Sequence, residues 1–326
     1  MVARRNHSID LVKFFAAILI TNSHMEDLYP GVFSNLAMGG AIGDGLFFFC
    51  SGFLLMMGRQ YGFFDWYKRR INRIFPTVFA VAIIGIVVFG RNPSLRGVLL
   101  YGGGWFVQAI LVFYAVFWFV KKYLSGRLWI AYAVDAVVVL VWFALFWDKE
   151  LFFLENATYL RWPCFFATML LGASAYRLES SGRRKQHRLG RSFVVLFALL
   201  VLYYGYQLLE GPLPFLKQVQ IVLLPVLAAI VWTVYEICSH PSVLKVYRSR
   251  YVYLPVYYIS ACCLEIYLSG RWSFPVGLSM IKLFPLNILV TFILIFIVAY
   301  IVKVFSNFLG QTVKTEPYDW KAMVRL

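Results

Sequence analysis

The sequence predicts an all-α integral membrane protein with about ten transmembrane helices and both termini in the cytoplasm. Three observations support this fold class. Hydrophobic residues make up 61% of the 326 residues. Charged residues make up only 14%, against about 25% in soluble domains. Apolar runs long enough to span a bilayer recur along the chain, and lysine and arginine gather in alternate loops between them.

Ten apolar runs of transmembrane length can be traced along the chain. They cover residues 9–23, 43–57, 75–89, 105–120, 128–147, 161–177, 192–209, 218–237, 251–269 and 286–304. No long polar block separates them, so we expect one transmembrane domain, residues 1–310, followed by a short cytoplasmic tail, residues 311–326. The basic N-terminus leads into the first run without a small-residue cleavage site, which predicts a retained signal anchor.

Lysine and arginine residues are distributed unevenly between the loops. The loops that follow odd-numbered spans hold only six of the 31 cations, namely Arg91, Arg96, Lys149, Lys217, Arg271 and Lys282. Twenty-two others lie in the remaining loops and near the two termini. Because cations resist translocation, the richer set marks the cytoplasmic side. Both termini are therefore predicted inside, and His24 near the outer face.

The net charge of +16 would favour a nucleic-acid partner in a soluble protein. Here the cations follow the predicted membrane topology instead, so we expect no nucleic-acid partner. The five cysteines lie inside or beside apolar runs and show no metal-ligand spacing. This pattern predicts that the cysteines are buried packing residues and that they form no metal site.

The first span carries three ionisable residues, Asp10, Lys13 and His24. Such a side chain at the centre of a membrane helix costs about 2.5–3.5 kcal/mol on insertion scales, which indicates a function. The step from Lys13 to His24 returns to within about 20° of the same helix face, about 16 Å along the axis. Asp10 lies three residues before Lys13, which predicts an ion pair between them. Snorkelling at the two membrane interfaces is the alternative.

A second concentration of charge precedes the third span, in the segment F-F-D-W-Y-K-R-R-I-N-R-I-F-P. On a helix Arg70 and Arg73 point the same way, and their guanidinium groups can bind phosphate through bidentate hydrogen bonds. Arg69 lies beside them. The pattern favours a nucleotide-like donor at the cytoplasmic face. Basic residues at a cytoplasmic boundary are also ordinary topology determinants, which is the alternative for these arginines.

Several short motifs follow one another in a fixed order. Lys13 and His24 are separated by ten residues, residues 43–55 read G-D-G-L-F-F-F-C-S-G-F-L-L, and Arg70-x-x-Arg73 precedes an Ile-x-Pro turn. Looser motifs are W-F through Tyr at 105–114, R-W-P at 161–163 and L-E-I-Y-L at 264–268. In this combination the chain resembles acyltransferase family 3, integral-membrane enzymes that O-acetylate bacterial surface polysaccharides.

The resemblance implies a donor, a base and a location. The donor would be acetyl-CoA or another acyl-CoA as co-substrate, with Arg70 and Arg73 near its phosphates, in a bacterial inner membrane. His24 would be the general base on a sugar hydroxyl, and an acetyl-histidine relay is the mechanistic rival. The chain has Lys13 where many members have arginine. The family histidine after L-E-I-Y-L is absent, because Ser269 and Gly270 stand there, so no role is carried over.

The same motifs supply further candidate residues, which are Asp44, Ser51, Arg161, Glu265 and Tyr267. Lys13, held by Asp10, could orient the base or stabilise an oxyanion. For Lys13, Asp44 and Glu265, the alternative to a catalytic role is a structural one, in which each forms a polar pair that helps two helices to pack.

Two functions from different classes remain open at this point. The first is O-acyl transfer to an acceptor at the lipid surface, either a cell-surface glycan or a lipid-linked sugar, handed over directly because no soluble extension is apparent. The second is a transporter or flippase for a polar lipid or glycan, since ten spans with buried charges also suit a substrate pathway. Against it, no internal repeat pairs the first five spans with the last five, and ionisable residues crowd the N-terminal third.

Overall fold

The structure, a computed structural model, describes residues 5–90, 92, 94–101, 104–154, 159–184, 187–312, 317–324 and 326. Within these ranges the chain is built from helices and contains no strand. In chain order they are α1 (His7–Ser23), η1 (Glu26–Leu28), η2 (Gly31–Leu36), α2 (Gly40–Met57), α3 (Phe63–Phe89), α4 (Leu95–Tyr101), α5 (Trp105–Tyr123), α6 (Leu128–Leu145), α7 (Arg161–Ser180), α8 (Leu189–Glu210), α9 (Phe215–Val219), η3 (Gln220–Val222), α10 (Leu223–Cys238), α11 (Pro241–Tyr247), α12 (Arg250–Ala261), α13 (Cys263–Met280), α14 (Leu286–Thr312) and α15 (Trp320–Met323).

Every predicted span lies on helical structure, and the all-α multi-pass fold is confirmed. In the described ranges, seven helices are long and apolar enough to cross a membrane. The count becomes eight if α12 and α13, which bend by 62° at the break between them, form one span. α1, with 17 residues, and α7 are not among the seven. The number ten and the side of each terminus therefore stay predictions.

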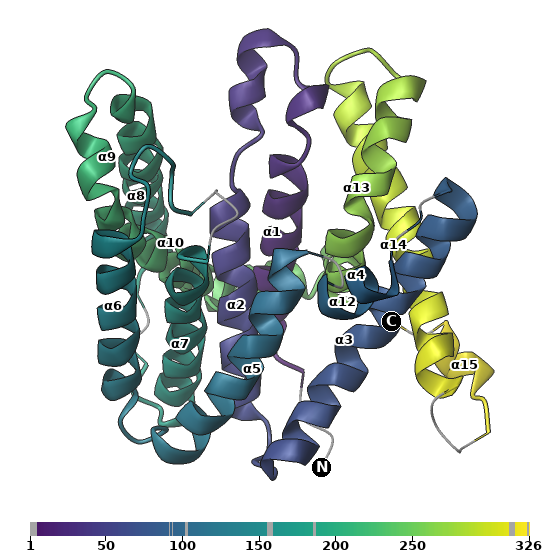
Figure 1. Cartoon of the computed structure of the whole chain (residues 1–326), viewed down its shortest axis with the longest axis horizontal. Helices are drawn as coiled ribbons and strands as arrows, with labels where there is room; N and C mark the ends of the chain where they lie inside the picture. Colours follow the sequence, from purple (N-terminus) through teal and green to yellow (C-terminus); the bar gives the residue numbers. More distant parts are fainter. Residues whose placement is uncertain are drawn as a thin grey trace. The chain divides into compact units, whose positions relative to one another are not determined.

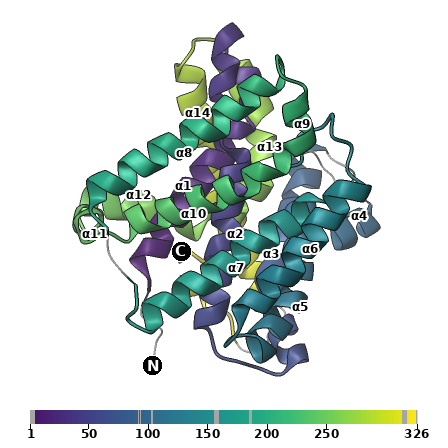
Figure 2. The same cartoon turned by 90° about the vertical axis from the view of Figure 1, so that its left-hand side faces the viewer.

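The chain forms two compact units. The first is made of residues up to Ala16, Ala41–Gln60 and Phe119–Val256. In it α8 packs against α10, and α7 packs against both α6 and α10, as Figure 2 shows for α8 and α10. α2 and α7 come closest at two glycines. A Cβ atom added at Gly52 would lie 1.8 Å from the Met169 carbonyl oxygen, and one at Gly172 would lie 1.9 Å from that of Phe49. Small residues allow such backbone contact between membrane helices.

The second unit is made of Ala17–Gly40, Tyr61–Trp118 and Tyr257–Leu326. Its centre is α14, which packs against α3 and α13 (Figure 1). α14 is polar on its inner side and apolar on its outer side. Asn287, Thr291 and Ser306 are buried, whereas a stripe with helical spacing, formed by Leu289, Ile293, Ile297 and Ile301, is exposed. This pattern is typical of a helix whose outer face meets lipid.

The C-terminal segment bonds back onto the end of α14. The helix runs to Thr312, two residues into the segment expected as a tail. The Asn307 side-chain amide donates to the Met323 carbonyl at 2.9 Å. The Gln311 amide donates to the Asp319 carbonyl at 3.1 Å, and the Asp319 N–H donates to the Gln311 side-chain oxygen at 2.8 Å. Residues 317–324 are therefore a fixed wall beside the last turns of α14.

We expect Gly52→Ala to destabilise the protein, because the new methyl group would collide with the α7 backbone, and overpacking costs about 1–3 kcal/mol. The matched control is Gly205→Ala on α8, where an added Cβ meets nothing within 4 Å. Thermal unfolding of the purified protein in detergent measures both. The close approach of α2 and α7 is refuted if Gly52→Ala melts at the same temperature as Gly205→Ala.

Candidate active site

The three predicted donor-binding arginines lie on α3, which begins at Phe63 and so includes the basic segment expected just before the span. The Arg69 guanidinium lies over the Tyr61 ring at 4.3 Å. That of Arg70 lies over the Trp66 ring at 4.6 Å and 5.8 Å from the centre of the Tyr114 ring. Aromatic rings attract a cation without neutralising it. These contacts therefore hold the arginines in place and leave their charge available.

Arg70 and Arg73 face the same region, as their spacing predicted, because both interact electrostatically with Tyr114 of α5. Within the described part of the chain, no carboxylate forms an ion pair with Arg69, Arg70 or Arg73. The Nε atom of Arg70 is buried and has no hydrogen-bond partner there. Positive charge without a carboxylate partner favours an anionic ligand.

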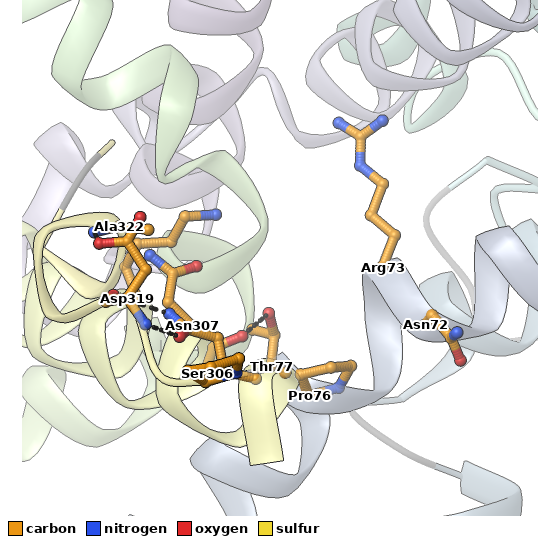
Figure 3. A pocket seen from close by; sticks show the side chains of 12 residues that line it. Asn72, Arg73, Pro76, Thr77, Ser306, Asn307, Asp319 and Ala322 are labelled. Carbon is orange, nitrogen blue, oxygen red and sulfur yellow. Dashed lines mark hydrogen bonds between the residues drawn. The ribbon is translucent and has the colours of Figure 1, made fainter. Parts of the chain in front are cut away.

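A cavity of ≈490 Å³ opens beside Arg73. It is lined by Asn72, Arg73, Pro76, Thr77, Lys303, Ser306, Asn307, Gly310, Gln311, Pro317, Asp319 and Ala322. Figure 3 shows Thr77, Ser306 and Asn307 gathered at one side, while the Arg73 side chain extends from α3 away from them. α3, α14 and the C-terminal segment thus form a polar pocket with two cationic residues, Arg73 and Lys303, in its lining.

A buried polar network lies against this cavity. Glu265, one of the predicted candidates, is 2% exposed. Its Oε1 accepts a hydrogen bond from the Thr77 hydroxyl at 3.1 Å and one from the Lys303 ammonium at 3.1 Å. The Thr77 and Ser306 hydroxyls are 2.9 Å apart. Because Thr77 donates its one proton to Glu265, Ser306 is the donor of that bond. Glu265 therefore ties α13 to both α3 and α14.

His24 directly follows the last residue of α1 and is exposed. The loop after it is fixed at several points. The Asn22 amide donates to the Leu36 carbonyl at 2.7 Å, and the Tyr29 hydroxyl donates to the Asn22 side-chain oxygen at 2.6 Å. The Asn287 amide donates to the Leu28 carbonyl at 2.7 Å. The His24 loop is thus attached to the first turn of α14.

The His24 loop and the cavity lie at opposite ends of α14. The loop binds Asn287 near the helix start, whereas the cavity is lined by residues from Lys303 to Gln311. At 1.5 Å per residue, Asn287 and Lys303 are about 24 Å apart along the axis. This separation approaches the thickness of a bilayer core, about 30 Å. The second unit therefore holds the His24 loop and the cationic pocket about 24 Å apart along the axis of α14.

The predicted ion pair between Asp10 and Lys13 is wrong. Asp10 is buried and accepts a hydrogen bond from Arg5 Nε at 2.5 Å, and His7 Nδ1 lies 3.9 Å away. Arg5 precedes the helix and reaches the first turn of α1, where an acidic group is also favoured by the helix dipole. Lys13 is half-buried and forms no ion pair with any described residue. It is not oriented by Asp10.

The remaining candidates are two residues of opposite charge type that interact electrostatically and two that make ordinary packing contacts. Asp44 on α2 interacts electrostatically with Arg161, the first residue of α7, which is 6% exposed. The Ser51 hydroxyl donates to the Phe47 carbonyl of its own helix at 3.1 Å, as is usual for a serine inside a helix. The Tyr267 ring lies 4.9 Å from that of Phe106. No group of three His, Cys, Asp or Glu residues in the described ranges could hold a metal ion.

Comparison with known proteins decides the family. A family model for an acyltransferase domain, that of acyltransferase family 3, matches residues 6–308. The chain belongs to acyltransferase family 3. No curated protein and no solved structure matches. This family 3 protein is therefore a multi-pass membrane acyltransferase, as the motifs predicted, and the match includes every predicted site residue.

In this family 3 acyltransferase the sequence argument missed Lys303 and the polar residues around it. Lys303 lies inside the tenth predicted span, so the rule that marked Asp10 and Lys13 as functional candidates applied to it equally. The aromatic partners of the arginines were also missed. Tyr61 and Trp66 are neighbours in sequence, but nothing in the sequence indicates that Tyr114 from another helix lies with them.

We expect Asp44 and Arg161 to depend on one another for stability. Asp44→Asn or Arg161→Gln alone leaves one buried charge without its partner, whereas the double variant leaves none. The double variant should therefore melt at a higher temperature than the sum of the single effects predicts, with a coupling of about 0.5–3 kcal/mol. Thermal unfolding of the four proteins measures this. Strictly additive losses would show that the two side chains do not act as a pair.

Proposed function

We propose that this acyltransferase moves an acyl group, acetyl in the simplest case, from cytoplasmic acyl-CoA to a hydroxyl group of an extracytoplasmic glycan or glycolipid. One observation carries the proposal. Arg73, which forms no ion pair with a carboxylate of the described chain, lines a polar cavity at one end of α14, and the loop of His24 is bonded to the other end. The acceptor is a cell-surface glycan or a lipid-linked sugar, and the membrane is a bacterial inner membrane.

The donor end of the site fits a polyanion. Acyl-CoA carries several phosphate charges, which cannot enter hydrocarbon. Arg70 and Arg73 present guanidinium groups that bind phosphate oxygens in pairs. The end of α14 that lines the cavity together with Arg73 of α3 is then the cytoplasmic end, in agreement with the excess of lysine and arginine in the loops on that side. The acyl group, at the tip of the uncharged pantetheine arm, is the only part of the donor that must travel toward His24.

The acceptor end supplies a base. Histidine side chains titrate near pH 6.5, so a neutral imidazole is available at physiological pH to remove a proton. His24 takes the proton of the acceptor hydroxyl as its oxygen attacks the thioester carbonyl. The carbon–sulfur bond then breaks, and the CoA thiolate leaves and is protonated. Asp10 is paired with Arg5, which assigns it to the structure of the first turn of α1.

Release of the CoA thiol on mixing purified protein, acetyl-CoA and acceptor glycan tests the function. We expect His24→Ala to lower the rate by about 10²–10⁴-fold, the usual contribution of a general base. The control is His187→Ala, which removes an exposed histidine of the first unit that lies 3.6 Å from Glu236. A normal rate for folded His24→Ala would refute the assignment of the base. A transporter would release no thiol from any variant.

Arg70→Gln and Arg73→Gln should each weaken CoA binding, because a charge-assisted hydrogen bond is worth about 1.5–3 kcal/mol. Isothermal titration calorimetry with CoA and purified protein measures the change. Lys68→Gln is the matched control, since Lys68 is an exposed cation on the same helix that neither lines the cavity, as Arg73 does, nor belongs to the cations that interact with Tyr114, as Arg70 and Arg73 do. If the affinities of both arginine variants equal that of Lys68→Gln, these arginines are topology charges only.

A further inference from the structure

Lys303 presents unused hydrogen-bond donors to the cavity. An ammonium group has three N–H donors. One of them binds Glu265 Oε1 at 3.1 Å, and no other partner occurs among the residues that the structure describes. The Lys303 side chain is 23% exposed and lines the ≈490 Å³ cavity together with Arg73. A cation with two free donors in a polar cavity is suited to bind an oxyanion.

The surroundings of Lys303 favour a ligand over a closed structural pair. The cavity wall also carries the side-chain amide of Asn72, which can donate to phosphate oxygens. The acid that lines the cavity, Asp319, caps α15 by accepting from the backbone N–H groups of Lys321 and Ala322 at 3.0 Å. Glu265 is the one carboxylate that contacts Lys303 in the described chain, and it fixes the direction of the ammonium group.

Lys303 lies deeper along the helices than Arg73. Its partner Glu265 is bonded to Thr77, which follows Arg73 by four residues on α3, or about 6 Å along the axis. On α14, Lys303 is also nearer to the His24 end than the other residues that line the cavity. A ligand that enters past Arg73 therefore reaches Lys303 with the part that points toward His24.

We propose that Lys303, positioned by Glu265, binds the pyrophosphate group of the acyl carrier, while Arg73 meets the phosphate nearer the mouth of the cavity. In CoA the pyrophosphate joins the pantetheine arm to the adenosine, and the 3′-phosphate lies on the far side of the adenosine. The pyrophosphate, which is the phosphate group nearest the pantetheine arm, thus meets Lys303, which lies deeper than Arg73. This inference rests on the proposed function, because it requires CoA as the donor.

The test measures the affinity of CoA and of 3′-dephospho-CoA for the purified full chain by calorimetry. We expect Lys303→Gln to weaken both ligands by the same factor, about 10–100-fold, because both contain the pyrophosphate. Glu265→Gln should weaken them less, since the cation remains and the oxygen of the new side-chain amide can still accept from Thr77. Lys68→Gln should change neither affinity.

A double variant keeps the test decisive if Lys303→Gln alone does not fold, as happens when a buried acid loses its partner. Glu265→Gln with Lys303→Gln removes both charges and should show the full loss of affinity.

The inference is overturned if either Lys303 variant binds 3′-dephospho-CoA as tightly as the unaltered chain. It is also overturned if Glu265→Gln is as harmful as Lys303→Gln, which would mark a structural pair. If Arg73→Gln weakens CoA while the Lys303 variants do not, only this inference fails. If the unaltered chain binds no CoA, the proposed function fails with it.

Discussion

In a bilayer, a polar group inside a spanning helix must find its partner within the protein, because hydrocarbon offers none. α14 shows what this constraint does. Its polar residues turn inward, where Asn287 binds the His24 loop and Ser306 binds Thr77. The aliphatic stripe formed by Leu289, Ile293, Ile297 and Ile301 turns outward. One helix thus holds the loop of the candidate base at one end and the wall of the cationic cavity at the other.

The same constraint explains how the cations are held. Pairing each arginine with a buried carboxylate would satisfy its charge and leave nothing for a ligand. Arg69 and Arg70 instead lie over aromatic rings, which attract the cation while its hydrogen-bond donors stay free. Lys303 is the exception, with Glu265 at 3.1 Å. A single carboxylate uses only one of its three donors, so the ammonium group is directed without being fully occupied.

The positions of the helices could be predicted from the sequence. In a membrane protein an apolar run of sufficient length forms a helix, and such a run can be recognised from local composition alone. Each of the ten runs lies on helical structure, although the runs 218–237 and 251–269 each extend over more than one helix. The start of the third was placed too late, since Phe63 to Ile74 is helical but too charged to be counted as a span. The bend between α12 and α13 was also missed, because hydropathy does not detect a break in a continuous apolar stretch.

Pairings within the site were much harder to predict, because most partners are distant in sequence. Glu265 and Lys303 are on different helices, as are Asp44 and Arg161. Even the prediction of an ion pair between two residues close in sequence, Asp10 and Lys13, was wrong. Helical spacing made Lys13 the obvious partner of Asp10, yet Arg5, which lies outside the helix and can approach from any direction, takes that place. Motifs therefore proposed candidate residues, and the contacts of those residues became visible only in the fold.

The distance between the two ends of the second unit also limits the chemistry. In the proposed reaction, a polyanionic carrier held by Arg73 would not follow its acyl group across about 24 Å of helix, because its phosphates would lose both water and their cations. Only the uncharged arm would cover that distance, and the base that receives the acceptor proton must be neutral at physiological pH. The proposed transfer therefore accounts for a cationic cavity at one end of α14 and the loop of a histidine at the other.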